Sequence, residues 1–134
     1  MYFTYSRTVR FADTDAAGVV YFAQVLSICH EAYEASLQNA LIDLKTFFKN
    51  ESVAIPIVHA EVDFFRPLYV GDLLLIKLSP EQISENEYEI TYQIVKDSSS
   101  TEQLATAKTK HVCINPNTRS RIKLPDAIIQ WLRC

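Results

Sequence analysis

A long segment from about residue 20 to 41 constrains the fold of this chain more than any other feature. Its polar residues recur every three or four positions, as they do along one face of an α-helix, and are Gln24, Ser27, Glu31, Glu34 and Gln38. The rest of the predicted helical surface is apolar. Because the polar stripe is so narrow, something else has to cover most of the circumference of this helix.

Alternating apolar and polar residues predict strands on both sides of the helix. Residues 2–11 alternate with one interruption at Arg7, and their apolar face consists of Phe3, Tyr5, Val9 and Phe11. After the helix, strands are predicted over about 55–66, 73–83, 86–96 and 103–115. Turn-forming sequences separate them at 69–72, 84–87 and 97–101. Short helical segments are predicted at 43–50 and 124–132.

This order of elements, one strand, one long helix and then a run of antiparallel strands, is typical of an α+β fold. We expect a single domain spanning residues 1–134, with a curved antiparallel sheet wrapped around one long central helix. Long strands at the edges of the sheet would expose unpaired backbone groups, and the helix needs further cover. Both features favour assembly into a dimer.

Composition excludes several classes of function. The net charge is −3 with scattered basic residues, so we expect no nucleic-acid partner. No apolar run approaches the ~20 residues of a membrane span, and the first residues lack the order of a signal peptide, so no membrane insertion and a cytoplasmic location are expected. The 3 cysteines are odd in number and widely spaced, which argues against disulfides and a zinc site. The sequence HEAYE at 30–34 has Glu34 where a zinc helix needs histidine, so no metal is expected.

The stretch FADTDAAGVVYF at 11–22 joins the first strand to the long helix and holds one of the 2 glycines of the chain. Gly18 lies where the chain must turn sharply. The first turn of a helix exposes unpaired amides that can receive the charge of an oxyanion, and a carboxylate beside them can attack a carbonyl or activate water. Asp13 and Asp15 could instead simply cap the loop and the helix, which aspartate often does, and local physics favours this interpretation while leaving both open.

A second stretch, VHAEVDFFRPLYVGD at 58–72, follows the helix, and with the first it resembles the hot-dog-fold thioesterases of the 4-hydroxybenzoyl-CoA thioesterase type. The likeness covers roughly residues 5–115. The sequences DTDAAGVVYFA and SICHEAYEASL are similar to those of the cyanobacterial and plastid members that hydrolyse 1,4-dihydroxy-2-naphthoyl-CoA on the route to phylloquinone. The resemblance implies an acyl-CoA substrate, no metal or redox cofactor, and a homotetramer built as a dimer of dimers.

The resemblance also implies roles for individual residues. Asp15 is expected to be the catalytic carboxylate, whether as nucleophile or as general base, and the backbone amide of Phe22, with Tyr21 beside it, is expected to be the oxyanion donor. Gly18 is expected at the substrate site as the residue of the turn. Asp13 is expected to organise the loop.

Other candidates are less specific. His59 could contact a hydroxyl of an aromatic acyl group or could be an ordinary residue on a sheet face. Glu31 could be catalytic, as in a related hot-dog subfamily, or part of a solvated or subunit-facing edge of the helix. CoA phosphates could contact basic residues near the last strand, namely Lys108, Lys110, Arg119, Arg121 and Lys123. Two other functions remain open: a short-chain acyl-CoA thioesterase of the Tol-Pal-associated type, and a non-catalytic acyl-CoA-binding module.

Overall fold

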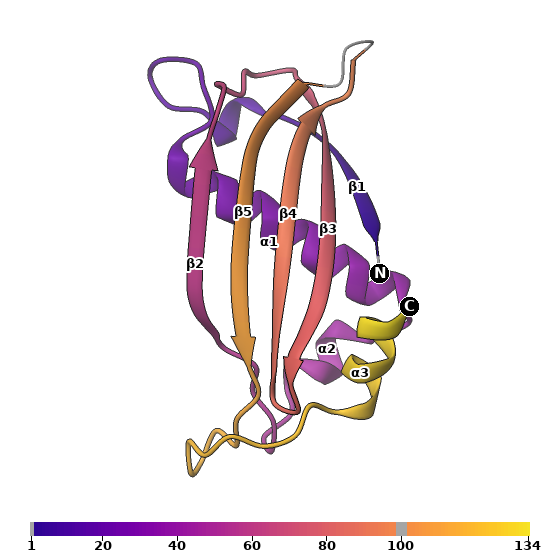
Figure 1. The fold of residues 1–134 in the computed structure, drawn as a ribbon. Helices are drawn as coiled ribbons and strands as arrows, with labels where there is room; N and C mark the ends of the chain where they lie inside the picture. The colour runs from indigo at the N-terminus through magenta and orange to yellow at the C-terminus, as the bar shows by residue number, and fades with distance from the viewer. Residues whose placement is uncertain (1, 99–101) are drawn as a thin grey trace.

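A computed structural model describes residues 2–98 and 102–134 of the chain. Its central feature is a five-stranded antiparallel sheet with strand order β1-β3-β4-β5-β2, which lies across the helix α1 (Phe22–Asn39) (Figure 1). The strands are β1 (Phe3–Thr8), β2 (Ile57–Phe64), β3 (Leu73–Ser84), β4 (Glu87–Lys96) and β5 (Glu102–Val112). The predicted α+β hot-dog architecture is confirmed.

The core lies between the sheet and α1. The clearest predicted strand, β4, buries the face made of Tyr88, Ile90, Tyr92 and Ile94, as its alternation indicates. On α1, the buried residues are Val25, Ile28, Cys29, Ala32, Tyr33, Ser36 and Leu37. This face is only part of the helix, and Phe22 and His30 on other faces are exposed. Within one chain the expected covering of α1 is therefore incomplete.

A buried aromatic cluster joins α1 to the sheet and to the C-terminal helix. The rings of Tyr88 and His111 stack at a centroid distance of 4.7 Å, and the Tyr33 and Tyr88 hydroxyls are hydrogen-bonded. The Trp131 indole donates to the Ser36 hydroxyl at 3.2 Å. Burial lowers the pKa of His111 to about 4, so this ring is neutral at pH 7. The cluster fixes the second half of α1 on the sheet.

The first strand is shorter than predicted. Pairing with β3 ends at Thr8, and Phe11–Asp13 forms a 3₁₀ turn. The assignment of Phe11 to the apolar strand face is wrong, because its side chain is 81 % exposed. The cause is Asp13, whose carboxylate accepts the Arg10 amide at 2.8 Å and whose own amide donates to the Arg10 carbonyl at 2.9 Å. These bonds turn the chain out of extended geometry.

The other predicted boundaries differ by a few residues at most. The central helix is two residues shorter at each end than the predicted 20–41, and Leu41, just beyond it, has the left-handed φ of 64°. The short helices are α2 (Leu44–Phe47) and α3 (Asp126–Arg133). The turn predicted at 97–101 falls partly outside the described residues, at 99–101.

Two of the cysteines are buried, Cys29 and Cys113, while Cys134 is exposed, and all three are free thiols. Among residues 2–98 and 102–134, no three histidine, cysteine or acidic side chains are grouped as metal ligands would be. No helix in the same part of the chain has the length and apolar character needed to span a membrane.

Candidate active site

Asp15 begins a tight turn in the loop between β1 and α1. Its amide donates to the Val19 carbonyl at 2.9 Å, and the Gly18 amide donates to the Asp15 carbonyl at 3.0 Å. Gly18 has a φ of 79°, in the left-handed region that favours glycine. One carboxylate oxygen of Asp15 accepts the Ala17 amide at 2.8 Å. The other oxygen, Oδ2, has no hydrogen-bond partner among the described residues. Asp15 is exposed to solvent, so a reactant can reach this oxygen.

The same loop returns to the N-terminus of α1. Tyr21 is the N-cap residue of the helix, and its amide donates to the Asp13 carbonyl at 3.0 Å. Phe22 follows as the first helical residue, whose amide has no acceptor within the helix. Of the two neighbouring amides at the start of the helix, that of Tyr21 therefore already has an acceptor. The Phe22 amide is the one that can serve as the oxyanion donor.

The second sequence stretch packs directly onto this loop. The Val20 amide donates to the Leu68 carbonyl at 2.8 Å, and Val19 pairs with Tyr69. Gly71, with a φ of 88°, turns the chain back so that its amide reaches the Val9 carbonyl at 2.9 Å. Between the two stretches lies an open groove of about 320 Å³, lined by Val19, Val20, Phe22, Phe64, Phe65, Arg66, Pro67 and Leu68.

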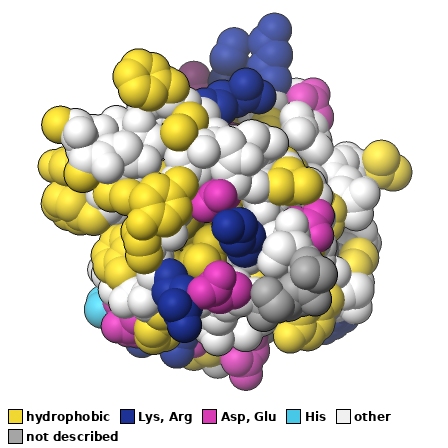
Figure 2. Space-filling model, turned by 90° about the horizontal axis from the view of Figure 1, so that it is seen from above, with side chains coloured by type: hydrophobic (Ala, Val, Ile, Leu, Met, Phe, Trp, Pro, Cys, Tyr) yellow, Lys and Arg dark blue, Asp and Glu magenta, His cyan; other side chains and the backbone are white. Residues whose placement is uncertain are grey.

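Aromatic side chains are concentrated at this end of the molecule. Seen from above, hydrophobic side chains gather on one side of the end that carries the β1–α1 loop (Figure 2). The exposed fractions are 81 % for Phe11, 46 % for Tyr21, 63 % for Phe22, 49 % for Phe64 and 57 % for Phe65. These rings are not part of the core of the described chain. Exposed apolar area of this kind is typical of a surface that binds a ligand or a partner protein.

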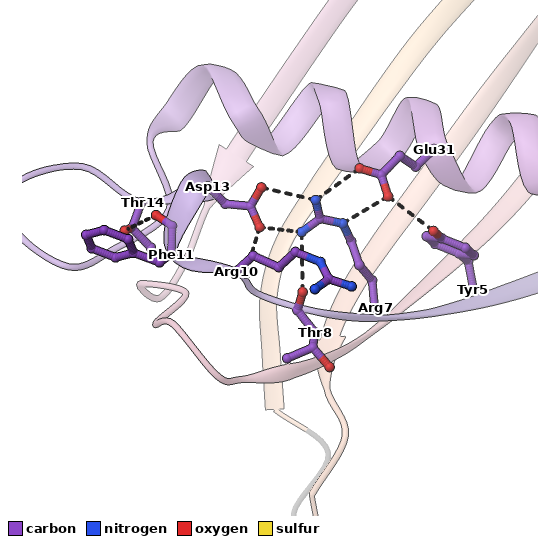
Figure 3. A network of polar contacts seen from close by, with 8 residues as sticks. All are labelled: Tyr5, Arg7, Thr8, Arg10, Phe11, Asp13, Thr14 and Glu31. Atoms are coloured by element: carbon purple, nitrogen blue, oxygen red, sulfur yellow. Dashed lines mark hydrogen bonds and ion pairs between the residues drawn. The ribbon is translucent and has the colours of Figure 1, made fainter.

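Arg7 joins the loop to the central helix (Figure 3). Its Nη1 lies 2.5 Å from Asp13 Oδ2 and its Nη2 lies 3.0 Å from Asp13 Oδ1, which makes a two-bonded contact. On the other side, Nε and Nη2 donate to the two Glu31 carboxylate oxygens at 2.9 and 3.0 Å. The Tyr5 hydroxyl adds a bond of 3.1 Å to Glu31. We call Arg7, Asp13 and Glu31 the arginine clamp.

The electrostatics of the clamp follow from this geometry. The Arg7 guanidinium and the Arg10 amide hold the pKa of Asp13 below its usual value, although burial opposes this. The pKa of Arg7 is raised chiefly by Asp13. Asp13 and Arg7 are therefore both charged at neutral pH. The expectation that Asp13 organises the loop agrees with these contacts. Glu31, whose two oxygens both accept bonds and whose side chain is 36 % exposed, has the environment of a structural partner rather than of a free base.

His59 lies away from the groove within one chain. It is in the middle of the edge strand β2, it does not line the groove, and its Nε2 lies 3.3 Å from Glu61 Oε1. The side chain is exposed. The structure thus does not bring His59 together with the groove residues of the same chain.

Three of the five basic residues considered for CoA phosphates are paired with carboxylates on the sheet. Lys108 and Lys110 lie 3.5 and 4.0 Å from Glu89, and Arg121 lies 3.6 Å from Glu87. Arg119, with a φ of 63°, borders a separate pocket beside α2. The three basic side chains are 40, 43 and 59 % exposed in these pairs, so part of each stays accessible to a ligand.

Sequence patterns alone do not predict the partners of the clamp or the groove. Arg7 interrupts an apolar strand face, which was the one local signal of a buried charge. Its acceptors are 6 and 24 residues away along the chain. The groove depends on Leu68 and its neighbours meeting Val20, and no periodicity reports that contact.

Comparison with known proteins places this geometry in a family. Residues 9–132 match the model of the thioesterase-like superfamily. A protein of Gloeothece citriformis named 1,4-dihydroxy-2-naphthoyl-CoA hydrolase is 61 % identical over 96 % of this chain and 90 % of its own. A protein of the same name from Rippkaea orientalis is 58 % identical over 96 % of this chain and 94 % of its own. The crystal structure of Slr0204, a 1,4-dihydroxy-2-naphthoyl-CoA thioesterase from Synechocystis, superposes with a TM-score of 0.95 at 41 % identity and covers 99 % of this chain and 96 % of that one.

Proposed function

Because the chain belongs to the thioesterase-like superfamily, we propose that it hydrolyses 1,4-dihydroxy-2-naphthoyl-CoA to 1,4-dihydroxy-2-naphthoate and free CoA. The names of its relatives supply the substrate. The observation in the structure that carries the proposal is the turn that holds the exposed Asp15 carboxylate in the loop leading to the free amide at the start of α1, beside an apolar groove. The product would be a precursor in phylloquinone biosynthesis.

The chemistry needs two groups. Asp15 either attacks the thioester carbonyl, forming a mixed anhydride that water then opens, or takes a proton from an attacking water. In both routes the Phe22 amide donates to the carbonyl oxygen as it gains negative charge. The C–S bond breaks, CoA leaves as a thiolate, and an oxygen from water remains in the naphthoate carboxylate. The free Oδ2 of Asp15 and the unpaired amide of Phe22 support these roles.

The aromatic groove leads to a prediction about substrate. Each well-placed ring contributes ~0.5–1.5 kcal/mol of stacking to a planar acyl group, beyond the burial of its area. We expect kcat/KM for 1,4-dihydroxy-2-naphthoyl-CoA, or for a stable hydroxynaphthoyl analogue, to exceed that for acetyl-, butyryl- and palmitoyl-CoA by at least about tenfold. Thiol release over this panel of thioesters measures the ratio.

The same panel separates the alternatives. A maximum on short aliphatic chains would replace the naphthoyl assignment with that of a short-chain acyl-CoA thioesterase. Tight binding of acyl-CoA without release of CoA would identify a non-catalytic binding module. His59→Ala, compared on substrates with and without the ring hydroxyls, tests whether His59 recognises a hydroxyl, since only the hydroxylated substrate should then lose kcat/KM.

We also propose that the enzyme works as a homo-oligomer built from dimers that pair along β2. This strand is at an edge of the sheet, and seven of its eight residues are exposed. Val58 and Phe64 on β2 are 57 and 49 % exposed, which is unusual for apolar residues of a strand. Two copies joined along β2 would also cover the exposed side of α1. A dimer of dimers is the form implied by the family resemblance.

Val58→Asp tests this arrangement. We expect it to shift the protein toward monomer and to lower activity, because a carboxylate on each copy would be buried in the interface. Sedimentation or light scattering measures the mass. Ile83→Asp is the matched control, since Ile83 on β3 is 51 % exposed and lies outside the proposed interface. Equal behaviour of the two variants would contradict pairing along β2.

A further inference from the structure

We propose that Arg7 is a positioning residue for thioester hydrolysis, and that it acts through Asp13 to fix the Asp15 carboxylate relative to the Phe22 amide. This inference rests on the proposed function, because it takes those two groups as the reacting carboxylate and the oxyanion donor. It assigns a role in the reaction to a side chain that belongs to β1, outside both sequence stretches that carry the family resemblance.

Asp13 is the residue through which Arg7 acts on both groups. Its carboxylate is held by two guanidinium nitrogens of Arg7, at 2.5 and 3.0 Å, while its backbone carbonyl accepts the Tyr21 amide at 3.0 Å. Tyr21 directly precedes Phe22, so Asp13 connects the clamp through the Tyr21 backbone to the amide that would donate to the oxyanion. A shift of Asp13 would move that amide.

Asp13 is equally close to the carboxylate. One residue, Thr14, separates it from Asp15 along the chain, and Thr14 pairs with Val20. The Asp15 amide then bonds to Val19, on the strand-like segment that enters α1. Backbone hydrogen bonds thus join the segment 13–15 to the segment 19–21 that leads into α1. Among the described residues, the only side-chain hydrogen bonds and ion pair that join this assembly to the body of α1 run through Arg7 to Glu31.

A contribution to stability alone does not account for the clamp. Arg7 points to the inner face of β1, where its side chain is 13 % exposed and where apolar side chains would pack. Buried ion pairs are often no more stabilising than apolar residues of similar volume, because desolvation offsets their attraction. An arginine adds a geometric constraint, because its planar guanidinium holds two carboxylates in defined orientations. Arg7 joins β1 to the β1–α1 loop, which carries Asp15, and to α1, which begins with Phe22, and these parts must be aligned for the reaction.

Arg7→Met is the first test. We expect kcat to fall by about 100-fold, since a displacement near 1 Å can cost ~10²-fold, while KM changes by less than about threefold. Arg10→Met is the matched control. It removes a positive charge from the same loop, but the Arg10 side chain is exposed and its link to Asp13 is through the backbone amide, which the variant keeps. We expect Arg10→Met to retain kcat within about threefold.

Arg7→Lys is a second variant, which keeps the inference testable if Arg7→Met does not fold. It retains a positive charge between the two carboxylates. A lysine ammonium is a point charge without the planar fork, so we expect kcat to fall by about tenfold with little change in melting temperature. A role in stability alone predicts nearly normal kcat for this variant. Melting temperature and circular dichroism of each variant are measured at the assay pH.

The Asp15→Asn background separates positioning from general damage. If Arg7 acts mainly by placing Asp15, Arg7→Met should cost about 100-fold in the parent protein but less than about tenfold once Asp15 is gone. An equal loss in both backgrounds, or full kcat in folded Arg7→Met and Arg7→Lys, would overturn the inference. Full activity of Asp15→Asn would instead overturn the proposed mechanism on which the inference rests.

Discussion

Asp15→Asn is expected to leave a folded protein whose kcat is lower by about a thousandfold or more. Removal of a positioned base or nucleophile costs ~10²–10⁴-fold or more, and an amide can be neither at neutral pH. Folding should survive, because the side chain is exposed and the Asn oxygen can still accept the Ala17 amide. Thiol release from the CoA thioester gives kcat, and thermal unfolding gives the stability.

Asp13→Asn is the control for this prediction. It removes the charge that Arg7 contacts but keeps an oxygen for the Arg10 amide, so kcat should fall by less than in Asp15→Asn, by roughly ten- to 100-fold. The melting temperature should fall by more, since Arg7 loses one of its two charged partners. If Asp13→Asn were the less active of the two folded variants, the reacting carboxylate would be Asp13 and the site would be wrongly assigned.

Gly18→Val is expected to lower kcat/KM by about 100-fold, more than its effect on melting temperature suggests. A Cβ at Gly18 would meet no atom within 4 Å outside the neighbouring residues of the chain, so a clash at this atom is not the expected cause. It comes from the φ of 79°, which a β-branched residue adopts only with strain. The turn should relax and carry Asp15 away from the helix amide, and a displacement near 1 Å can cost ~10²-fold.

Ala16→Val provides the comparison within the same turn. Ala16 is exposed and does not have a positive φ, so a valine there adds the same bulk without backbone strain. We expect kcat/KM of Ala16→Val to stay within about threefold of the parent. Normal turnover in Gly18→Val, or equal losses in the two variants, would show that the geometry of the turn is not critical.

Local patterns were sufficient for most of the fold. The alternation in β4 and the helical period of α1 report which side of each element is apolar, and this property is carried by neighbouring residues. The same holds for Gly18 and Gly71, which mark the two sharp turns and have positive φ values. The family resemblance rested on the two sequence stretches together, and the structure brings them into contact at Val20 and Leu68.

Predictions failed where a distant or competing contact decided the geometry. Phe11 continues the alternation of the first strand, yet bonds between Asp13 and Arg10 turn the chain before it. Tyr21 was expected beside the oxyanion donor, and its amide donates to the Asp13 carbonyl, a contact that no sequence pattern indicated. Neither bond changes the apolar period of the sequence, so neither could be read from it.

The sequence by itself determined the α+β order, the buried faces of the strands and the place of the Asp15 turn, because each depends on side chains close together in the chain. Only the tertiary structure decided how that turn is held. Arg7 is apparent in the sequence as one charged residue on an apolar face, and its partners become known only when β1 packs against α1 and brings Glu31 within 2.9 Å. A charge pair across 24 residues has no sequence period, since its geometry is set by the packing of the elements that carry it.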